Sequence, residues 1–186
     1  MKALLIVDLQ NDFLPGGALP APDGKKIIPV INKLLGQFGL VVASKDWHPA
    51  DSIHFQKWPV HCVADSEGAA FPKELKQSKI KTVLLKGTRN SDDGYSAFEA
   101  TNIQFNNYLQ KNQVKKLYVC GLTTEYCVKN TVFDALDAGY KTFVVRDAVE
   151  AVQAQPGDEE KAWQEMQAAG ATIIYSDEVE NRPESS

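Results

Sequence analysis

The stretch KKLYVCGLTTEYCVKN, residues 115–130, joins a short apolar run to the beginning of a helical pattern. Residues 115–120 have the length and apolar content of a buried strand. Gly121 follows this run, and residues 125–138 then show helical spacing of their apolar side chains. A strand that leads directly into a helix is the repeating unit of a sheet with parallel strands. The stretch therefore predicts an α/β fold if the rest of the chain repeats it.

The same alternation continues along the chain. Apolar runs predict further strands at 3–8, 40–45, 81–86, 141–146 and 172–175. Helical patterns occur at 25–37, 102–112, 125–138 and 158–169. Because each crossover must return the chain to the same end of the sheet, we predict a doubly wound, six-stranded parallel sheet with helices on both faces.

Length and composition limit the choice of function. A chain of 186 residues with 44% hydrophobic content suits one domain, 1–186, with only the tail at 180–186 expected to be flexible. Twenty basic side chains against 24 acidic ones give a net charge of -4, so we expect no nucleic-acid partner. Five apolar residues before Asp8 are too few for a signal peptide or a membrane span. We therefore expect a cytoplasmic protein without a membrane partner.

Two predicted connections, 46–70 and 87–101, are longer than a compact α/β unit needs. Long connections in compact domains are usually functional or disordered. The first is rich in aromatic and imidazole rings, which disordered segments usually lack. We therefore expect it to be ordered and functional.

The three cysteines are an odd number, which argues for reduced thiols rather than a disulfide framework. Cys127 lies just beyond a predicted strand, where Thr123 or Thr124 could cap the following helix. A helix start favours the thiolate, so a lowered thiol pKa and a role as nucleophile are one interpretation. The other is that Cys127 is a small core residue, as we expect for Cys120 inside its strand.

Charged residues follow several predicted strands. Asp8, Asp46 and Lys86 lie at or just after strand ends, as Cys127 does. In an open parallel sheet, ligands bind beyond these ends, where the strand order reverses. The four side chains could therefore meet in one catalytic crevice, although Asp8 and Lys86 could also form a purely structural ion pair.

All three histidines, His48, His54 and His61, fall within 14 residues of one another and close to Asp46. Imidazole and carboxylate ligands suit Zn²⁺, and also Fe²⁺ or Mn²⁺, so we predict a divalent transition metal ion as cofactor. Cys62 could be a further ligand or could simply be packed. The alternative is a chance group of surface histidines.

Five motifs along the chain carry a resemblance to a known family. They are IVDLQNDF (6–13), SKDWHP (44–49), WPVHCV (58–63), LLKGT (84–88) followed by GYSAFE (94–99), and GLTTEYCVKNTVFDAL (121–136). Together they resemble, in order and over nearly the whole chain, the nicotinamidases (pyrazinamidases) of the isochorismatase-like cysteine hydrolase superfamily. The resemblance implies hydrolysis of nicotinamide to nicotinate and ammonia through a cysteine thioester, a reaction of NAD salvage.

The resemblance also implies roles for single residues. The catalytic residues would be Asp8, Lys86 and Cys127. The metal ligands would be Asp46, His48 and His61, with His54 in or next to the coordination shell. The substrate-binding residues would be Phe13 and Trp58 on the two sides of the pyridine ring, together with a cis peptide between Leu122 and Thr123. Backbone amides at Thr123 and Cys127 would hold the oxyanion.

Several alternatives compete with this interpretation. A related metal-independent amidohydrolase could act on a carbamoyl or ureido compound, but such relatives generally lack the aspartate and histidine set. Isochorismatase itself does not use the cysteine found at position 127. A nucleotide-binding module is disfavoured because no GxGxxG follows the first strand. The sequence leaves open which metal binds and whether the protein is a homo-oligomer.

Overall fold

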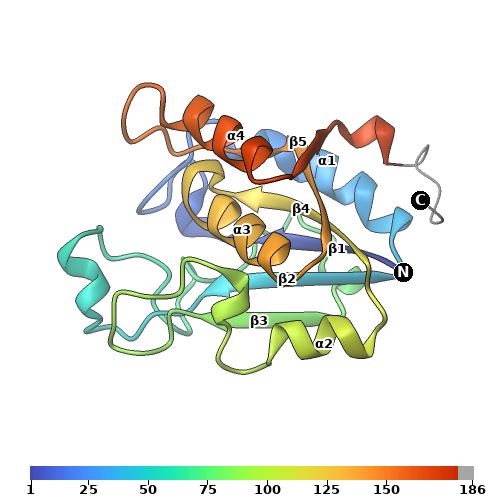
Figure 1. Ribbon diagram of the computed structural model, residues 1–186. Helices are drawn as coiled ribbons and strands as arrows, with labels where there is room; N and C mark the ends of the chain where they lie inside the picture. The colour runs from blue at the N-terminus through green and yellow to red at the C-terminus, as the bar shows by residue number, and fades with distance from the viewer. Residues whose placement is uncertain (180–186) are drawn as a thin grey trace.

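Six strands form one parallel sheet in the described part of the protein. The structure is a computed structural model that describes residues 1–179 (Figure 1). The strand order is β3-β2-β1-β4-β5-β6. The strands are β1 (Lys2–Val7), β2 (Leu40–Asp46), β3 (Thr82–Lys86), β4 (Lys116–Leu122), β5 (Lys141–Glu150) and β6 (Thr172–Ile174). The predicted doubly wound parallel sheet is confirmed, and the tail predicted at 180–186 lies outside the described residues.

The helices also overlap their predicted ranges. They are α1 (Ile27–Leu34), α2 (Phe105–Lys111), α3 (Lys129–Asp137) and α4 (Asp158–Ala168). Shorter helical turns are η1 (Asn11–Phe13), η2 (Gly24–Lys26), η3 (Leu35–Gln37), η4 (Ile53–Gln56), η5 (Gln77–Lys79), η6 (Ala97–Glu99), the π-helical η7 (Thr124–Val128) and η8 (Ser176–Glu178). Within the described part of the chain, no helix is both long enough and apolar enough to span a membrane.

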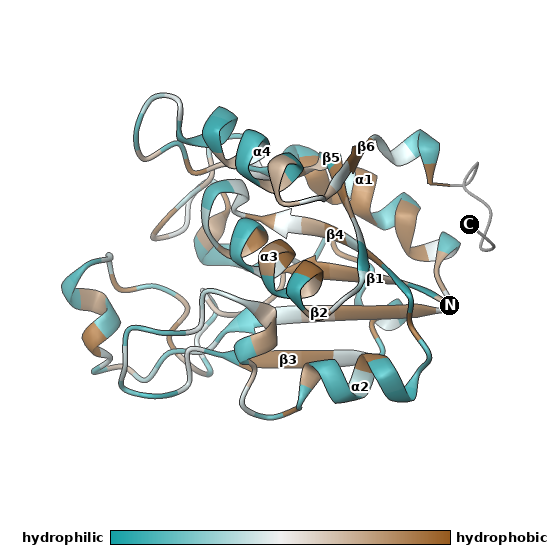
Figure 2. Cartoon of the chain, viewed as in Figure 1, coloured by the Kyte–Doolittle hydropathy of each residue, from teal (hydrophilic) through white to brown (hydrophobic). Residues whose placement is uncertain are grey.

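The central strands β1, β2 and β4 are buried on both faces, and their alternate residues face different helices. Side chains such as Leu4 and Ile6 of β1 pack in one core cluster with α1, whereas Leu5 and Val7 pack in the other with α2, α3 and α4. Figure 1 shows α1 behind the sheet and α3 in front of it. In Figure 2 the central strands are almost uniformly apolar, as strands of a parallel sheet covered on both faces should be.

The strand order reverses between β1 and β4, which are neighbours in the sheet. The connection from β1 leads towards β2 and β3 on one side, while the connection from β4 leads towards β5 and β6 on the other. The two connections therefore separate at the carboxyl ends of the strands and open a crevice there. Asp8 follows β1, and Cys127 lies in the turn after β4.

Gly121 near the end of β4 allows this crevice to form. Its φ is +111°, and the register between β4 and β5 shifts there. A Cβ on Gly121 would lie 2.0 Å from the carbonyl oxygen of Val7. Only glycine lets the two backbones approach so closely while the chain turns towards Cys127.

Gly121→Ala should therefore destabilise the fold strongly. Gly139→Ala is a matched control, because Gly139 also has a positive φ of +85° but a Cβ there would meet no atom within 4 Å. We expect the control to lower the free energy of unfolding by about 1–2 kcal/mol through backbone strain alone, and Gly121→Ala to lower it by clearly more. Urea denaturation of both variants measures this, and equal losses would show that the approach to Val7 is not limiting.

Candidate active site

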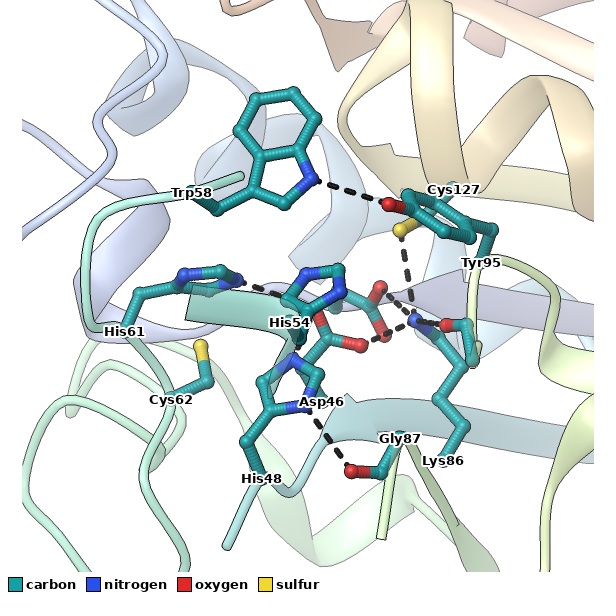
Figure 3. A network of polar contacts seen from close by, with 12 residues as sticks. Asp46, His48, His54, Trp58, His61, Cys62, Lys86, Gly87, Tyr95 and Cys127 are labelled. Atoms are coloured by element: carbon teal, nitrogen blue, oxygen red, sulfur yellow. Dashed lines mark hydrogen bonds and ion pairs between the residues drawn. The ribbon is translucent and has the colours of Figure 1, made fainter. Parts of the chain in front are cut away.

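The carboxyl ends of three adjacent strands carry the buried charges that the sequence predicted. Asp8 directly follows β1, Asp46 ends β2 and Lys86 ends β3, and the register pairs Asp46 with Lys86. All three side chains are buried. Figure 3 shows Asp46 and Lys86 pointing towards one another below Cys127. The predicted convergence of these four residues is confirmed.

Lys86 is the centre of this group. Its ammonium nitrogen lies 2.7 Å from Asp8 Oδ2 and 2.5 Å from Asp46 Oδ1. It also donates to the carbonyl oxygen of Gly94 at 2.6 Å and contacts Cys127 Sγ at 3.4 Å. Burial opposes the positive charge, but Asp46 and Asp8 outweigh it and hold the pKa of Lys86 well above its ordinary value. The lysine is therefore charged in the folded protein.

Asp8 is fixed by a neighbouring strand and by its own backbone. The Ser44 hydroxyl donates to Asp8 Oδ1 at 2.7 Å. The φ of Asp8 is +44°, a strained value of the kind that occurs at functional sites. Burial raises the pKa of Asp8, Lys86 opposes this, and Asp46 adds to it, so the net shift is upward. A carboxylate with a raised pKa is a better proton acceptor than an ordinary aspartate.

Cys127 lies in the π-helical turn η7, and this corrects the expected environment of the thiol. Thr123 precedes the turn without a capping bond from its side chain, and the Thr124 hydroxyl is buried without a partner. Burial raises the pKa of the Cys127 thiol well above its ordinary value, and Lys86 only partly offsets this. The prediction of a lowered pKa is therefore wrong, because burial outweighs the positive charge of Lys86.

The three histidines lie together on one side of this group. One ligand atom from each lies within 4.8 Å of the others. The Nδ1 atoms face acceptors, namely the Gly87 carbonyl for His48 (3.0 Å), the Asp92 carboxylate for His54 (3.0 Å) and the Pro59 carbonyl for His61 (2.6 Å). Because these partners can only accept, each Nδ1 carries a hydrogen. In the neutral ring the Nε2 atom then has a lone pair that can bind a metal. Outer partners of this kind orient metal-binding histidines.

Asp46 connects the histidines to Lys86. Its Oδ2 lies 3.7 Å from His48 Nε2 and 3.9 Å from His61 Nε2, while Oδ1 contacts Lys86. Burial alone would raise the pKa of Asp46, but the charge of Lys86 reverses this and lowers it. His48 Nε2 is buried without a hydrogen-bond partner. An orphaned imidazole nitrogen beside an ionised carboxylate and two further imidazoles fits a divalent transition metal ion.

A partly open cavity lies above these groups. Its lining includes Cys127 as well as residues of the histidine group. The lining residues include Phe13, Leu19, Asp46, His54, Trp58, His61, Tyr95, Thr123, Tyr126, Cys127 and Val152. The peptide between Leu122 and Thr123 is cis, as expected. Phe13, Trp58 and Thr123 line the cavity, whereas the Leu122 side chain is buried in the core. An apolar cavity with a few polar groups at one end suits a small aromatic ligand.

The other two cysteines are core residues. Cys120 is fully buried in β4, and burial raises the pKa of its thiol. Cys62 is also fully buried, and it packs in the core cluster of α1. Its backbone N–H donates to Asp12 Oδ2 at 2.7 Å, which fixes the chain next to His61. Of the two interpretations of Cys62, packing is therefore the one that the structure favours.

Sequence reasoning missed several supporting residues. The Gln10 side chain donates to the Asp46 carbonyl and accepts from the Asp46 amide, both at 2.8 Å. Ser44 holds Asp8, and the Tyr95 hydroxyl accepts from Trp58 Nε1 at 3.1 Å. Gln10 and Ser44 had a detectable signal, since each is a polar residue in or next to an apolar strand. Asp92 and Tyr95 lie in the long 87–101 connection, but nothing in their spacing indicated their contacts.

Comparisons with known proteins agree on one family. A family model described as Isochorismatase, isochorismatase domain, matches residues 2–178. The nicotinamidase of Escherichia coli is 40% identical, with 92% of this chain and 93% of the relative covered. A crystal structure of the pyrazinamidase of Pyrococcus horikoshii in complex with zinc is 41% identical with a TM-score of 0.83, covering 94% of this chain and 98% of that one. The yeast nicotinamidase bound to the inhibitor nicotinaldehyde is 29% identical with a TM-score of 0.86, covering 94% and 100%.

Lys86→Met should destabilise the protein much more than Lys129→Met. The first change leaves two buried carboxylates without their cation, which typically costs about 3–5 kcal/mol. The control removes a partly exposed ion pair between Lys129 and Glu165, 2.8 Å apart, which is worth at most about 1 kcal/mol. Urea denaturation of both variants at neutral pH compares the two losses.

The loss in Lys86→Met should also depend on pH. Without Lys86 the pKa of Asp8 rises further above its value in the unfolded chain, because Lys86 opposes the upward shift. The native variant then binds this proton more tightly than the unfolded chain does, so stability falls as pH rises. Relative to wild type, the loss should be larger at pH 8 than at pH 5. A loss that is larger at pH 5 would contradict this account of the charges.

Proposed function

The chain belongs to the isochorismatase domain family, and from this premise we infer that it is an amidohydrolase that converts nicotinamide to nicotinate and ammonia. Relatives named as nicotinamidases match more than nine-tenths of the chain. The observation that carries the inference is one apolar cavity bordered by both a thiol beside a lysine–aspartate pair and a group of three histidines. The first group suits attack on a carboxamide, and the second suits recognition of a pyridine nitrogen.

We propose that Cys127 is the nucleophile and Asp8 the general base. Asp8 takes the thiol proton, and the sulfur forms a bond to the carboxamide carbon. Lys86 stays protonated and stabilises whichever of the two neighbours is negative, since it contacts both Asp8 and Cys127. The carbonyl oxygen becomes an oxyanion, for which we propose the backbone amides of Thr123 and Cys127 as donors.

The intermediate then collapses towards the acyl-enzyme. The carbon–nitrogen bond breaks, and protonated Asp8 gives its proton to the leaving amine, which departs as ammonia. The thioester on Cys127 is next attacked by water, from which Asp8 takes a proton. Expulsion of the sulfur, with return of this proton to it, releases nicotinic acid and restores the thiol. The sum is one water consumed and one ammonia released for each nicotinamide.

We propose Asp46, His48, His54 and His61 as the residues that hold a divalent transition metal ion. The orphaned His48 Nε2 and the fixed Nδ1 bonds of all three rings support this set. Burial lowers the pKa of His54 and of His61, which keeps the rings neutral and able to ligate. When bound, such an ion supplies a Lewis acid for the ring nitrogen of the substrate. Zn²⁺ is the preferred ion in this proposal, with Fe²⁺ and Mn²⁺ as alternatives.

The cavity also suggests the range of substrates. We propose that Phe13 and Trp58 bind the two faces of a six-membered aromatic ring, because both line the cavity that Cys127 borders. A pocket that recognises a ring face and one ring nitrogen should accept pyrazinamide as well as nicotinamide. The metal-independent alternative, an amidohydrolase for carbamoyl or ureido compounds, leaves the three buried histidines without a role. We propose the cytoplasm as the compartment, in keeping with three free thiols.

Cys127→Ala should abolish turnover, because the thiol is the proposed covalent nucleophile. Loss of a nucleophile of this kind typically lowers kcat by roughly 10⁶-fold. Cys120→Ala is the matched control, since Cys120 is buried away from the cavity and should affect stability more than rate. Ammonia release is measured with nicotinamide, pyrazinamide and an N-carbamoyl amino acid. Hydrolysis of the last compound alone would favour the alternative, and near wild-type activity in Cys127→Ala would refute the mechanism.

Metal content should follow the histidines and not the cysteine. We expect the wild type to hold about one transition metal ion per chain, and strong chelation to remove activity that Zn²⁺, Fe²⁺ or Mn²⁺ restores. His48→Ala should lose both metal and activity, whereas Cys127→Ala should keep its metal. Elemental analysis of the three proteins, with circular dichroism to verify folding, tests this. A metal-free wild type with full activity would remove the metal from the proposal.

A further inference from the structure

The three histidines of the site are oriented by different kinds of acceptor. His48 and His61 donate to backbone carbonyls, whose positions are set by the chain itself. His54 instead donates to a side-chain carboxylate, Asp92, which comes from the connection between β3 and α2. The orientation of His54 therefore depends on one residue that is distant in sequence and can be replaced without removing a backbone group.

Asp92 extends this contact to the wall of the substrate cavity. The same oxygen that accepts from His54 also accepts from the Tyr95 hydroxyl at 2.9 Å. Tyr95 in turn accepts from Trp58 Nε1 at 3.1 Å, and Figure 3 shows this bond across the mouth of the site. His54, Trp58 and Tyr95 all line the cavity. A continuous chain of hydrogen bonds thus runs from a proposed metal ligand to a proposed ring-binding residue.

A backbone hydrogen bond connects the two ends of this series of hydrogen bonds, His54 and Trp58. The amide of Trp58 donates to the carbonyl of His54 at 3.2 Å, so both residues belong to one turn. A second bond between the two connections, from the Ile53 amide to Asn90 Oδ1 at 2.7 Å, holds this turn against the 87–101 segment. A rotation of the Asp92 side chain would therefore disturb the His54 and Trp58 side chains together.

We propose that Asp92 is a positioning residue that couples the orientation of His54 towards the metal to the placement of Trp58 over the substrate cavity. It acts through His54 and Tyr95. The inference rests on the proposed function, because it assumes that the histidines bind a metal. The orientation of His54 for metal binding and the position of the Trp58 ring at the cavity then both depend on the Asp92 carboxylate.

A simpler role for Asp92 is its ion pair with Lys57. The Lys57 side chain is 66% exposed, and exposed ion pairs contribute little. The buried side of Asp92 faces His54, whose side chain is only 6% exposed. The two roles can be separated, because Lys57→Met removes the ion pair and leaves the acceptor for His54 and Tyr95 in place. Asp92→Ala removes both, and Asp92→Asn retains an oxygen that can accept.

Zinc affinity is the first measurement. Metal-free wild type and variants are titrated with Zn²⁺ alone against a chromophoric chelator. Asp92→Ala should bind Zn²⁺ about 10- to 100-fold more weakly, as is typical when an outer-shell partner is lost. Asp92→Asn should recover most of the affinity, and Lys57→Met should bind as wild type does. An affinity in Asp92→Ala equal to that of Lys57→Met would overturn the proposal.

The second measurement follows Trp58 itself. Exchange of the indole Nε1 hydrogen with solvent is recorded by NMR on ¹⁵N-labelled protein, with the resonance assigned by its absence in Trp58→Phe. Zn²⁺ should slow this exchange in wild type and in Lys57→Met. It should not do so in Asp92→Ala, nor in Tyr95→Phe, where the acceptor is missing. Equal protection by Zn²⁺ in Asp92→Ala and wild type would overturn the coupling.

The two proposals can fail separately. A wild type that neither binds Zn²⁺ nor hydrolyses nicotinamide would contradict the proposed function. A wild type that does both, beside a folded Asp92→Ala variant with unchanged zinc affinity and unchanged Trp58 protection, would contradict only the role of Asp92. Circular dichroism and thermal unfolding of Asp92→Ala verify that it is folded, and Asp92→Asn provides the comparison if Asp92→Ala is not.

Discussion

The buried ammonium of Lys86 is the constraint on which the rest of the site depends. Removing such a charge from water costs several kcal/mol unless its hydrogen bonds and its charge are matched. Lys86 is matched by Asp8, Asp46 and the Gly94 carbonyl, and it also contacts Cys127. These partners come from the residue after β1, the end of β2, the connection after β3 and the turn after β4. Strands β1, β2 and β3 must therefore end at one level, and the long connection must fold back over them.

Two glycines allow that connection to reach the lysine and a histidine at once. Gly87 has a φ of +65°, and a Cβ there would lie 2.5 Å from the His48 ring. A Cβ on Gly94 would lie 2.4 Å from the Gly87 amide nitrogen. Both positions thus depend on the absence of a side chain. The same short stretch of backbone supplies a carbonyl to Lys86 and another to His48, so the charge group and the histidine group are built as one unit.

The sequence was sufficient for the fold and for most charged side chains of the site, and the reason lies in where they occur. Asp8, Asp46 and Lys86 lie at or just after the ends of apolar strands. A charge that is buried with such a strand needs a partner of opposite charge, because an unpaired buried charge is costly. Parallel strands bring such ends to one edge of the sheet, so their meeting could be predicted without coordinates. The environment of Cys127 could not, because a local pattern suggests a helix start but does not show how completely the tertiary structure excludes water. Asp92 was missed for a related reason, since His54 and Lys57 lie in a different connection and share no periodic pattern with it.

The correction at Cys127 changes how the proposed proton transfer should be understood. Burial raises the pKa of the thiol, which favours a neutral sulfur, and Asp8, whose pKa is also raised, is the proposed base beside it. Moving the proton from sulfur to Asp8 leaves the net charge of the buried group unchanged. The negative charge only moves from one neighbour of Lys86 to another, and the ammonium contacts both before and after the transfer. Moving a charge around a fixed cation requires far less desolvation than creating a thiolate in the same cavity, which is how a buried and weakly acidic thiol can still serve as a nucleophile.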